Sequence, residues 1–356
     1  MVMIIKWSLG IDVGAKSIRC SLCSIDSTQQ VKVKASRKFN NTAAGLQEVL
    51  LWIRKHYKDG QAPLSIAMEA TGVYYERCAL LLQKEGFRVS VVLPTKAKRY
   101  LQALGLKSKN DKIDAEGLAR MGAEQQLAEW SAASPQMYGL RLLTRQHEDL
   151  QKSITSFNNQ LHAISHGMYR YEDIEKSYQQ TICKLQEFLE KVEEAISETV
   201  KQNEVLKQKV ELLCSIKGVG ELTAATIIAE TNGFALFENQ KQLESYSGYD
   251  VIENQSGDHV GKTKISKKGN SHIRRILHMA SLNVVTYNVK PFVNLYERVY
   301  PKTNIKMKGY VAVQRKLLVI LYTLYKKNQK FDPNYLEKTI GERKTEPSFG
   351  LASQKP

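Results

Sequence analysis

The order of apolar runs in the first hundred residues constrains the fold of this chain more than any other feature. Residues 7–25 are typical of two strands joined by a turn at Gly14, and residues 31–39 of a third strand with alternating apolar positions. A helix is predicted next, from Asn41 or Thr42. Its apolar stripe consists of Leu46, Val49, Leu50 and Ile53.

The chain then continues in strand–helix units. Residues 64–68 and 87–93 predict short buried strands, residues 74–85 predict a helix, and a basic helical stretch starts at Pro94. The predicted order is therefore βββαβαβα. A strand meander that leads into β-α units favours a mixed sheet with helices on its faces. We expect an α/β domain over residues 1–130.

A proline-free span between Pro135 and Pro291 follows this domain. Two heptad seams lie within it, formed by Leu143, His147, Leu150, Ile154, Phe157, Leu161 and Ile164, and by Ile182, Leu185, Leu189, Val192 and Ile196. Spacings of four and three residues predict two long helices over residues 131–205, either an antiparallel hairpin or a dimerising coiled coil. We expect His147 to be packed in the seam rather than to bind a ligand.

The remaining chain predicts a mainly helical domain over residues 206–340. Residues 211–233 are typical of a helix, a tight Gly-Val-Gly turn and a second helix, and resemble a helix-hairpin-helix element. A glycine- and serine-rich loop is expected past residue 250, with helices near residues 271–289 and 309–327. The polar tail, residues 341–356, is expected to be disordered.

Charge is concentrated near the end of the chain. The net charge is +16, and residues 260–330 hold 16 Lys and Arg against a single acid, Glu297. Such one-sidedness predicts binding to phosphate backbones. No apolar run approaches the roughly 20 residues of a membrane-spanning helix, and the N-terminus lacks the features of a signal peptide. We expect a cytoplasmic protein that binds nucleic acid and no membrane.

The cysteines do not predict a metal or redox site. There are five, an odd number without an export signal, which favours free thiols. Cys20 and Cys23 form a Cys-x-x-Cys pair, but they lie in a predicted strand, where a spacing of three puts their side chains on opposite faces. We interpret them as small apolar side chains.

Four acids occupy positions from which they can act together. Asp12 and Glu69 lie at the ends of predicted strands, and Asp111 and Asp114 are three residues apart at the start of a predicted helix. Carboxylates this close repel one another unless divalent cations lie between them. Mg²⁺ is the expected ion, with Mn²⁺ as a substitute, and two such ions could clamp the oxygens of a phosphodiester.

The motifs that carry these acids resemble a known family. GIDVGAKS, AMEATGVYYE and NDKIDAEGLAR look like the motifs of DEDD insertion-sequence transposases of the IS110 group, which also includes the Piv-type DNA invertases. The resemblance implies an RNase H-like fold of the RuvC type and Asp12, Glu69, Asp111 and Asp114 as metal-binding catalytic acids. It also implies recombination of donor and target DNA, a structured guide RNA and a homo-oligomer, a dimer or tetramer.

The C-terminal part resembles the same family. Ser256 and the following glycine match its catalytic serine, whose hydroxyl would attack phosphorus and hold a DNA end covalently. Nucleic-acid contacts are expected from Lys262, Lys264, Lys267, Lys268, Arg274, Arg275, Gly218, Gly220, Arg315 and Lys316. The sequence departs from the family in lacking a proline within residues 247–251.

Two other readings of the sequence stay open. The first is a RuvC-like structure-specific endonuclease that hydrolyses DNA and releases free ends. The second is a non-catalytic nucleic-acid-binding protein on an inactive nuclease fold, against which the presence of all four acids argues. Covalent attachment of DNA to the protein distinguishes the transposase from the endonuclease.

Overall fold

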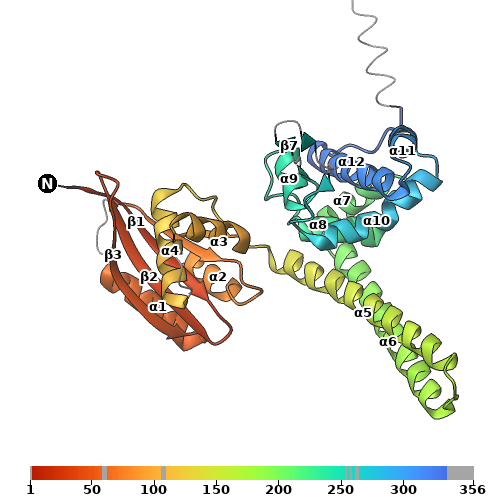
Figure 1. Cartoon of the computed structure of the whole chain (residues 1–356), viewed down its shortest axis with the longest axis horizontal. Helices are drawn as coiled ribbons and strands as arrows, with labels where there is room; N and C mark the ends of the chain where they lie inside the picture. The colour runs from red at the N-terminus through yellow and green to blue at the C-terminus, as the bar shows by residue number, and fades with distance from the viewer. Residues whose placement is uncertain are drawn as a thin grey trace, which may run out of the picture. The chain divides into compact units, whose positions relative to one another are not determined.

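A computed structural model of the chain describes residues 2–57, 62–105, 110–252 and 264–334, together with the backbone of residues 255–256 and 259–260. The chain folds into two compact units, Met1–Ala132 and Ala133–Pro356 (Figure 1). The first unit is α/β, and the second is built mainly of helices. Both agree with the fold class predicted for them.

The first unit is organised around a five-stranded mixed sheet with the order β3-β2-β1-β4-β5. The strands are β1 (Ile4–Val13), β2 (Ser17–Asp26), β3 (Val31–Asn40), β4 (Leu64–Glu69) and β5 (Arg88–Val92). The first three form an antiparallel meander, whereas β4 runs parallel to β1, and β5 parallel to β4. This confirms the predicted βββαβαβα order and the RNase H-like mixed sheet.

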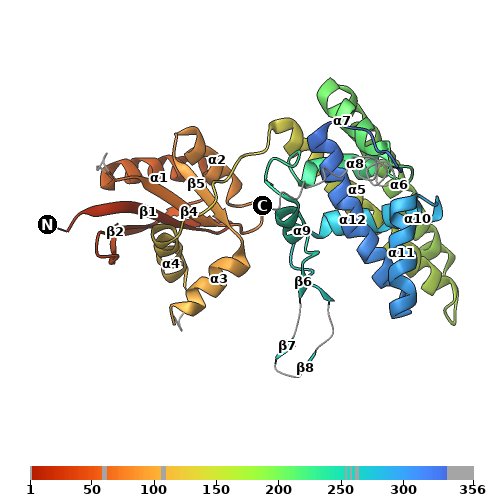
Figure 2. The ribbon, with the colours of Figure 1, turned by 90° about the horizontal axis from the view of Figure 1, so that it is seen from above.

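The two faces of β1 differ in side-chain size, and the helices divide between them accordingly. Leu9 and Ile11 point into a core that is shared with α1 (Ala43–His56) and α2 (Glu76–Lys84). Ser8 and Gly10 face the other way, where their small size lets α4 (Asp111–Glu124) approach the sheet closely. Figure 2 shows α1 and α2 on one side of the sheet, and α3 (Pro94–Ala103) with α4 on the other.

The two neighbouring cysteines of β2 lie on opposite faces, as predicted. Cys20 packs in the core beneath α1 and α2, and Cys23 packs against Ala119 of α4. Both are buried free thiols. Burial raises the pKa of Cys23 to about 12, so this side chain is an uncharged packing group.

The second unit begins with a two-helix arm, formed by α5 (Pro135–Ser165) and α6 (Glu172–Lys201), which lie side by side (Figure 1). The helices are antiparallel, since His147 Nε2 lies 2.9 Å from Glu193 Oε1 while the rings of Phe157 and Tyr178 are 5.7 Å apart. The two heptad seams therefore pack against each other within one chain, which is the antiparallel hairpin of the two predicted arrangements. His147 is buried in the seam, as predicted.

The base of the arm shares one hydrophobic core with the helices that follow it. Leu140 and Ile196 of the arm cluster with Ile227 and Leu317. The helices concerned are α7 (Glu204–Cys214), α8 (Glu221–Glu230), α9 (Gln240–Tyr246), α10 (Ser271–Thr286), α11 (Lys290–Thr303) and α12 (Lys306–Lys327). The sequence did not predict α9, which is short, or α11, where Pro291 occupies the first turn, a position that tolerates proline.

The segment expected to be a glycine- and serine-rich loop contains a β-ribbon instead, so this prediction was wrong. Its stem pairs β6 (Val251–Ile252) with β9 (Lys264–Ile265), and beyond it β7 (Gln255–Ser256) pairs with β8 (His259–Val260). Figure 2 shows β7 and β8 farther from the helices than β6. The β-branched residues Val251, Ile252 and Ile265 of the stem favour strands, although the surrounding sequence is rich in glycine and serine. The expected disordered tail lies outside the described residues.

Within the described ranges, no helix combines the length and the apolar composition needed to cross a membrane.

Candidate active site

Asp12 and Glu69 lie next to each other at the carboxyl ends of two parallel strands. In the register of β1 with β4, Gly10 pairs with Ala67 and Ile11 with Met68, and Asp12 and Glu69 are the next residues along. Side chains at paired positions of parallel strands point to the same face of the sheet. Both acids are half-buried. The pairing of these two strand-end carboxylates agrees with the arrangement expected from the sequence.

Helix α4 covers the face to which these two acids belong. Gly10 lies beneath Ala115 and Ala119, and at the other end of the helix an added Cβ atom on Gly122 would collide with the side chain of Ser8, two residues earlier on β1. The helix therefore runs antiparallel to β1, and its first turn lies towards the carboxyl ends of β1 and β4. The close approach depends on the absence of side chains at Gly10 and Gly122.

The first turn of α4 supplies the other two acids. The helix starts at Asp111 because the side chain of Asn110 caps it, accepting a hydrogen bond of 2.9 Å from the backbone nitrogen of Ile113. Asp111 is exposed and Asp114 half-buried. Negative charge at a helix N-terminus is favourable, since unpaired backbone N–H groups point towards it. The fold thus brings the backbone of all four predicted acids to one edge of the sheet.

The four carboxylates do not yet form a compact ligand group. Among the residues that the structure describes, no three His, Cys, Asp or Glu side chains come together as a group that could hold a metal ion. The chemistry of the donors nevertheless fits a hard divalent cation, which prefers carboxylate oxygens. The fold supplies the common edge and the donor type.

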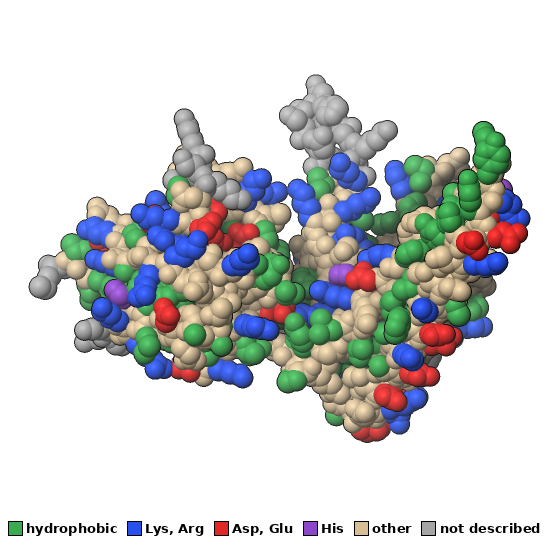
Figure 3. All heavy atoms as spheres, turned by 90° about the horizontal axis from the view of Figure 1, so that it is seen from below, with side chains coloured by type: hydrophobic (Ala, Val, Ile, Leu, Met, Phe, Trp, Pro, Cys, Tyr) green, Lys and Arg blue, Asp and Glu red, His purple; other side chains and the backbone are tan. Residues whose placement is uncertain are grey.

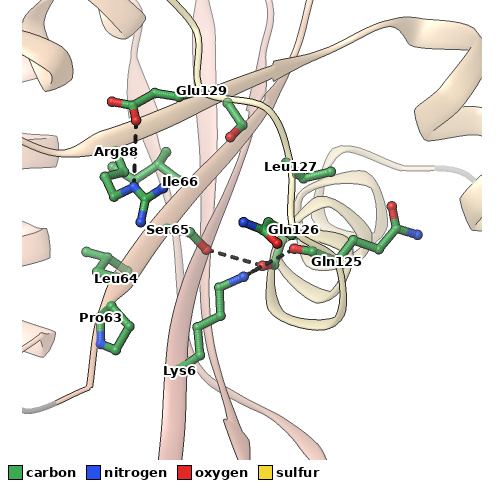
Figure 4. A pocket seen from close by; sticks show the side chains of 12 residues that line it. Lys6, Pro63, Leu64, Ser65, Ile66, Arg88, Gln125, Gln126, Leu127 and Glu129 are labelled. Atoms are coloured by element: carbon green, nitrogen blue, oxygen red, sulfur yellow. Dashed lines mark hydrogen bonds and ion pairs between the residues drawn. The ribbon is translucent and has the colours of Figure 1, made fainter.

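A cavity of about 300 Å³ lies at the opposite end of the sheet, remote from the acids. It is lined by the starts of the parallel strands and the end of α4, including Lys6, Ser65 and Arg88 (Figure 4). Lys6 Nζ donates to the carbonyl oxygens of Gly122 at 2.5 Å and of Gln125 at 3.2 Å. Burial and the nearby Arg88 charge lower the pKa of Lys6. Lys6 thus caps the C-terminus of α4.

The predicted nucleophile, Ser256, lies on β7 of the ribbon, opposite His259 of β8. The side chains of both residues lie outside the described part of the chain. Backbone hydrogen bonds hold the base of the ribbon: the nitrogen of Lys267 donates to Gly248 O at 3.0 Å and that of Ser266 to Asp250 O at 2.8 Å. Gly248 has a φ of +73°, which favours glycine, and its lack of a Cβ atom lets Arg274 pass close to it.

The lysines predicted to contact nucleic acid differ in how exposed they are. Lys264, Lys267 and Lys268 are exposed at and beyond the ribbon stem, whereas Lys262 lies outside the described residues. Lys316 is half-buried. Figure 3 shows Lys and Arg side chains spread over much of one face of the molecule. The exposed lysines are the side chains best placed to meet phosphate.

The three predicted arginines already have partners within the protein. Arg274 Nη1 donates to Ser247 O at 2.9 Å, Arg275 lies 3.5 Å from Glu148, and Arg315 lies 2.6 Å from Glu244. Sequence could not reveal these contacts, because Glu148 and Glu244 are distant along the chain. The guanidinium groups therefore stabilise the fold in addition to any contact they make with nucleic acid.

The Gly-Val-Gly turn between α7 and α8 is only partly open. Gly218 has a φ of +105° and lies against α10, where an added Cβ atom would come within 3.0 Å of Val284 N. Gly220, the N-cap of α8, is exposed and has open space around it. Of the two predicted glycine contacts, the surroundings of Gly220 leave room for a phosphate and those of Gly218 are packed.

Two models of known protein families match the chain. One, DEDD_Tnp_IS110, described as "Transposase", matches residues 9–169, and the other, described as "Transposase IS116/IS110/IS902 family", matches residues 210–297. The first span contains all four acids, and the second contains Ser256.

Individual relatives span most or part of the chain. The "Pilin gene-inverting protein" of Moraxella bovis is 26% identical over 328 residues, which cover 92% of this chain and 98% of that protein. The "Transposase for insertion sequence element IS1111A" of Coxiella burnetii is 23% identical over 219 residues, covering 54% and 58% respectively. A solved structure of T. thermophilus RuvC with a Holliday junction substrate is 14% identical, with a TM-score of 0.25, over 32% of this chain and 90% of that one.

Proposed function

This chain belongs to the IS110 family of DEDD transposases, and from that premise we propose that it cuts and rejoins DNA strands by means of an acidic cluster and a serine nucleophile. The acids are Asp12, Glu69, Asp111 and Asp114, and the nucleophile is Ser256. The observation that carries the proposal is the juxtaposition of Asp12 with Glu69 on parallel strands, beneath a helix whose first turn holds the other two acids.

The acids would hold a divalent cation, Mg²⁺ with Mn²⁺ as a substitute. When bound, such an ion supplies positive charge next to the phosphodiester oxygens. The protein's own contribution is to hold the carboxylates on a sheet edge and a helix start, which are rigid elements.

Ser256 would act as the nucleophile. Its Oγ forms a bond to phosphorus as the P–O bond to one DNA strand breaks, the serine proton leaves to solvent, and the released strand takes up a proton. The protein–DNA ester preserves the energy of the phosphodiester, so that a second strand's hydroxyl can displace the serine. Such an intermediate allows strands to be rejoined without an external energy source.

The nucleic-acid partners are donor and target DNA and, by the family resemblance, a structured guide RNA. The exposed Lys264, Lys267 and Lys268 support binding to phosphate but do not distinguish RNA from DNA. Recombination assayed with and without transcripts of the DNA that flanks the gene tests the guide. Equal recombination in both cases would remove RNA from the proposal.

Recombination brings together ends from two duplexes, so we propose that at least two copies act together, as a dimer or tetramer. The two-helix arm is the proposed interface: Ile154 is buried between its helices, whereas Phe157 and Leu161 are only half-buried and leave apolar surface for a second copy. Sedimentation of the protein with and without DNA measures the number of copies, and a monomer in the active complex would contradict the proposal.

Covalent trapping tests the proposed function directly. Wild-type protein incubated with Mg²⁺ and a cognate substrate should retain a DNA strand after denaturation, on the peptide that contains Ser256. Ser256→Ala should form no adduct, and Ser266→Ala, which removes another hydroxyl from the same segment, should form it normally. Cut strands without any adduct would replace the serine mechanism by the hydrolytic one of a RuvC-like endonuclease.

A further inference from the structure

Glu230, the last residue of α8, is the least exposed acid among the described residues. Its side chain is 0% exposed. A carboxylate buried to this degree is costly unless charged or polar partners replace the lost water. The preceding residues of the helix, ATIIA, are apolar apart from Thr226, so the local sequence does not indicate which residues are these partners.

The partners of Glu230 come from two distant parts of the second unit. Arg145 of α5 forms a bidentate pair, with Nε donating to Oε1 at 2.6 Å and Nη2 to Oε2 at 2.9 Å. Asn270 Nδ2 donates to Oε2 at 2.6 Å. Although burial opposes it, hydrogen bonds from Arg145 and Asn270 hold the pKa of Glu230 below its ordinary value. Glu230 is therefore an ionised link between the arm and Asn270.

Asn270 is the joint between the β-ribbon and helix α10. Its Oδ1 caps the helix by accepting from the backbone nitrogens of His272 at 2.9 Å and Ile273 at 3.2 Å. Its own backbone nitrogen donates to Tyr246 O at 2.7 Å. Only four residues separate it from the end of β9. The position of Asn270 therefore sets where the ribbon leaves the helical unit.

The arm holds the same joint at a second point. Glu148, three residues beyond Arg145 on α5, accepts a hydrogen bond of 2.6 Å from His272 Nδ1. Residues three apart lie on one face of a helix. Two contacts on one face of the arm thus orient the first turn of α10 and, with it, the base of the ribbon.

We propose that Glu230 is a positioning residue for strand transfer, which with Arg145 and Asn270 fixes the base of the Ser256-bearing ribbon to the arm. A buried ion pair adds little net stability compared with apolar packing, and its best-attested use is to specify one arrangement. Here the arrangement specified is that of the ribbon relative to α5. The inference rests on the proposed function only in assigning the nucleophile to Ser256.

The test replaces the link without removing the helix cap. Asn270→Asp keeps an acceptor for the backbone nitrogens of α10, since Asp and Asn are equally good N-caps, but it places a carboxylate against Glu230. Glu230→Gln alone turns a donor towards Arg145 or Asn270. Together, Asn270→Asp and Glu230→Gln restore a donor–acceptor pair of reversed sense between these two residues and keep one carboxylate near Arg145, although Arg145 Nη2 loses its acceptor on residue 230. The double variant is therefore the rescue that a mere loss of packing does not provide.

A matched control lies in the same unit. Asn203 is the N-cap of α7, accepts from the backbone nitrogen of Leu206 at 3.0 Å and donates from Nδ2 to Gln136 of the arm at 2.6 Å. Asn203→Asp therefore makes the same chemical change at a cap that does not adjoin the ribbon. All variants are compared at a temperature at which circular dichroism shows each of them fully folded.

Two quantities are measured, the single-turnover rate of the Ser256 adduct at saturating DNA and hydrogen exchange of the peptide spanning residues 264–273. Asn270→Asp should slow the adduct about tenfold or more, with DNA affinity unchanged and exchange in this peptide raised. Asn203→Asp should alter neither, and the double variant should recover part of both. The inference would be overturned if Asn270→Asp showed the adduct rate and the hydrogen exchange of wild type. It would also be overturned if the double variant recovered neither quantity. Failure of wild-type protein to form any adduct would instead remove the proposed nucleophile, while the exchange measurement still decides whether the link holds the ribbon.

Discussion

Gly10 of β1 lies directly beneath Ala115 of α4, so closely that a Cβ atom on the glycine would overlap the alanine's carbonyl oxygen. Asp12 is two residues further along the strand and therefore on the same face, and Asp114 immediately precedes Ala115 in the helix. The contact thus sets the separation between the strand that carries one acid and the helix that carries another. Because Gly10 has no side chain, the start of α4 can lie close to the end of β1, which brings the two parts of the candidate active site together.

We predict that Gly10→Ala pushes α4 away from the sheet, destabilises the first unit by about 1–3 kcal/mol and strongly reduces DNA cleavage. Thermal unfolding and a cleavage assay at a temperature below the transition separate the two effects. Gly139→Ala in α5 is the control, because an added Cβ there meets nothing within 4 Å. It should leave cleavage intact and stabilise its helix slightly. Normal activity of Gly10→Ala would show that the spacing of α4 does not matter.

Asp12→Asn should abolish strand exchange, a loss of at least about a thousandfold, while nucleic-acid affinity stays within about threefold of wild type. The amide has the shape of the carboxylate but lacks its charge, so packing is preserved and cation binding is not. Glu48→Gln serves as the comparison, since Glu48 is an exposed acid of the same unit whose side chain lies 3.6 Å from Arg37. A normal recombination rate in Asp12→Asn would mean that the acidic cluster is misassigned.

Replacing an exposed lysine and replacing an arginine that forms an ion pair within the protein should have different effects on the salt dependence of nucleic-acid affinity. Lys268→Ala is expected to reduce the slope of log affinity against log salt by about 1, the loss of one phosphate contact. Arg315→Ala removes the ion pair with Glu244, 2.6 Å away, so it should lower the melting temperature and leave the slope unchanged. Filter binding over a range of salt concentrations measures the slope. The reverse result would assign Arg315, not Lys268, to the nucleic-acid interface.

Acid should loosen the contact between the arm and α10. Burial raises the pKa of Glu148, but hydrogen bonds from Lys152 and His272 outweigh it, and the pKa lies below the ordinary 4.5. The ionised carboxylate therefore stabilises the fold above pH 4.5, and this stabilisation is lost as the pH falls through the lowered pKa. We expect the melting temperature of wild type to fall more steeply between about pH 5 and pH 3 than that of Glu148→Gln. Asp149→Asn, an exposed neighbour that pairs with the same lysine, should keep the wild-type slope. Parallel curves for wild type and Glu148→Gln would contradict this account.

Much of the first unit follows from local sequence. The alternation of Leu9, Ile11 and Val13 with Ser8, Gly10 and Asp12 predicts both the strand and the face on which the acid lies. Strand order along the chain then predicts a mixed sheet, and with it the pairing of the ends of β1 and β4. The heptad spacing likewise predicts two long helices. These features depend on neighbours two to four residues apart, which a sequence displays directly.

Tertiary structure decided what depends on distant partners. The same heptad seam serves a hairpin or a dimer, and only the contacts of His147 with Glu193 and of Phe157 with Tyr178 show that it closes within one chain. Arg145 and Glu230 are 85 residues apart in sequence, and nothing near either of them indicates the other. Periodicity encodes which face of an element is buried, whereas the partner of a buried charge is chosen by the path of the whole chain.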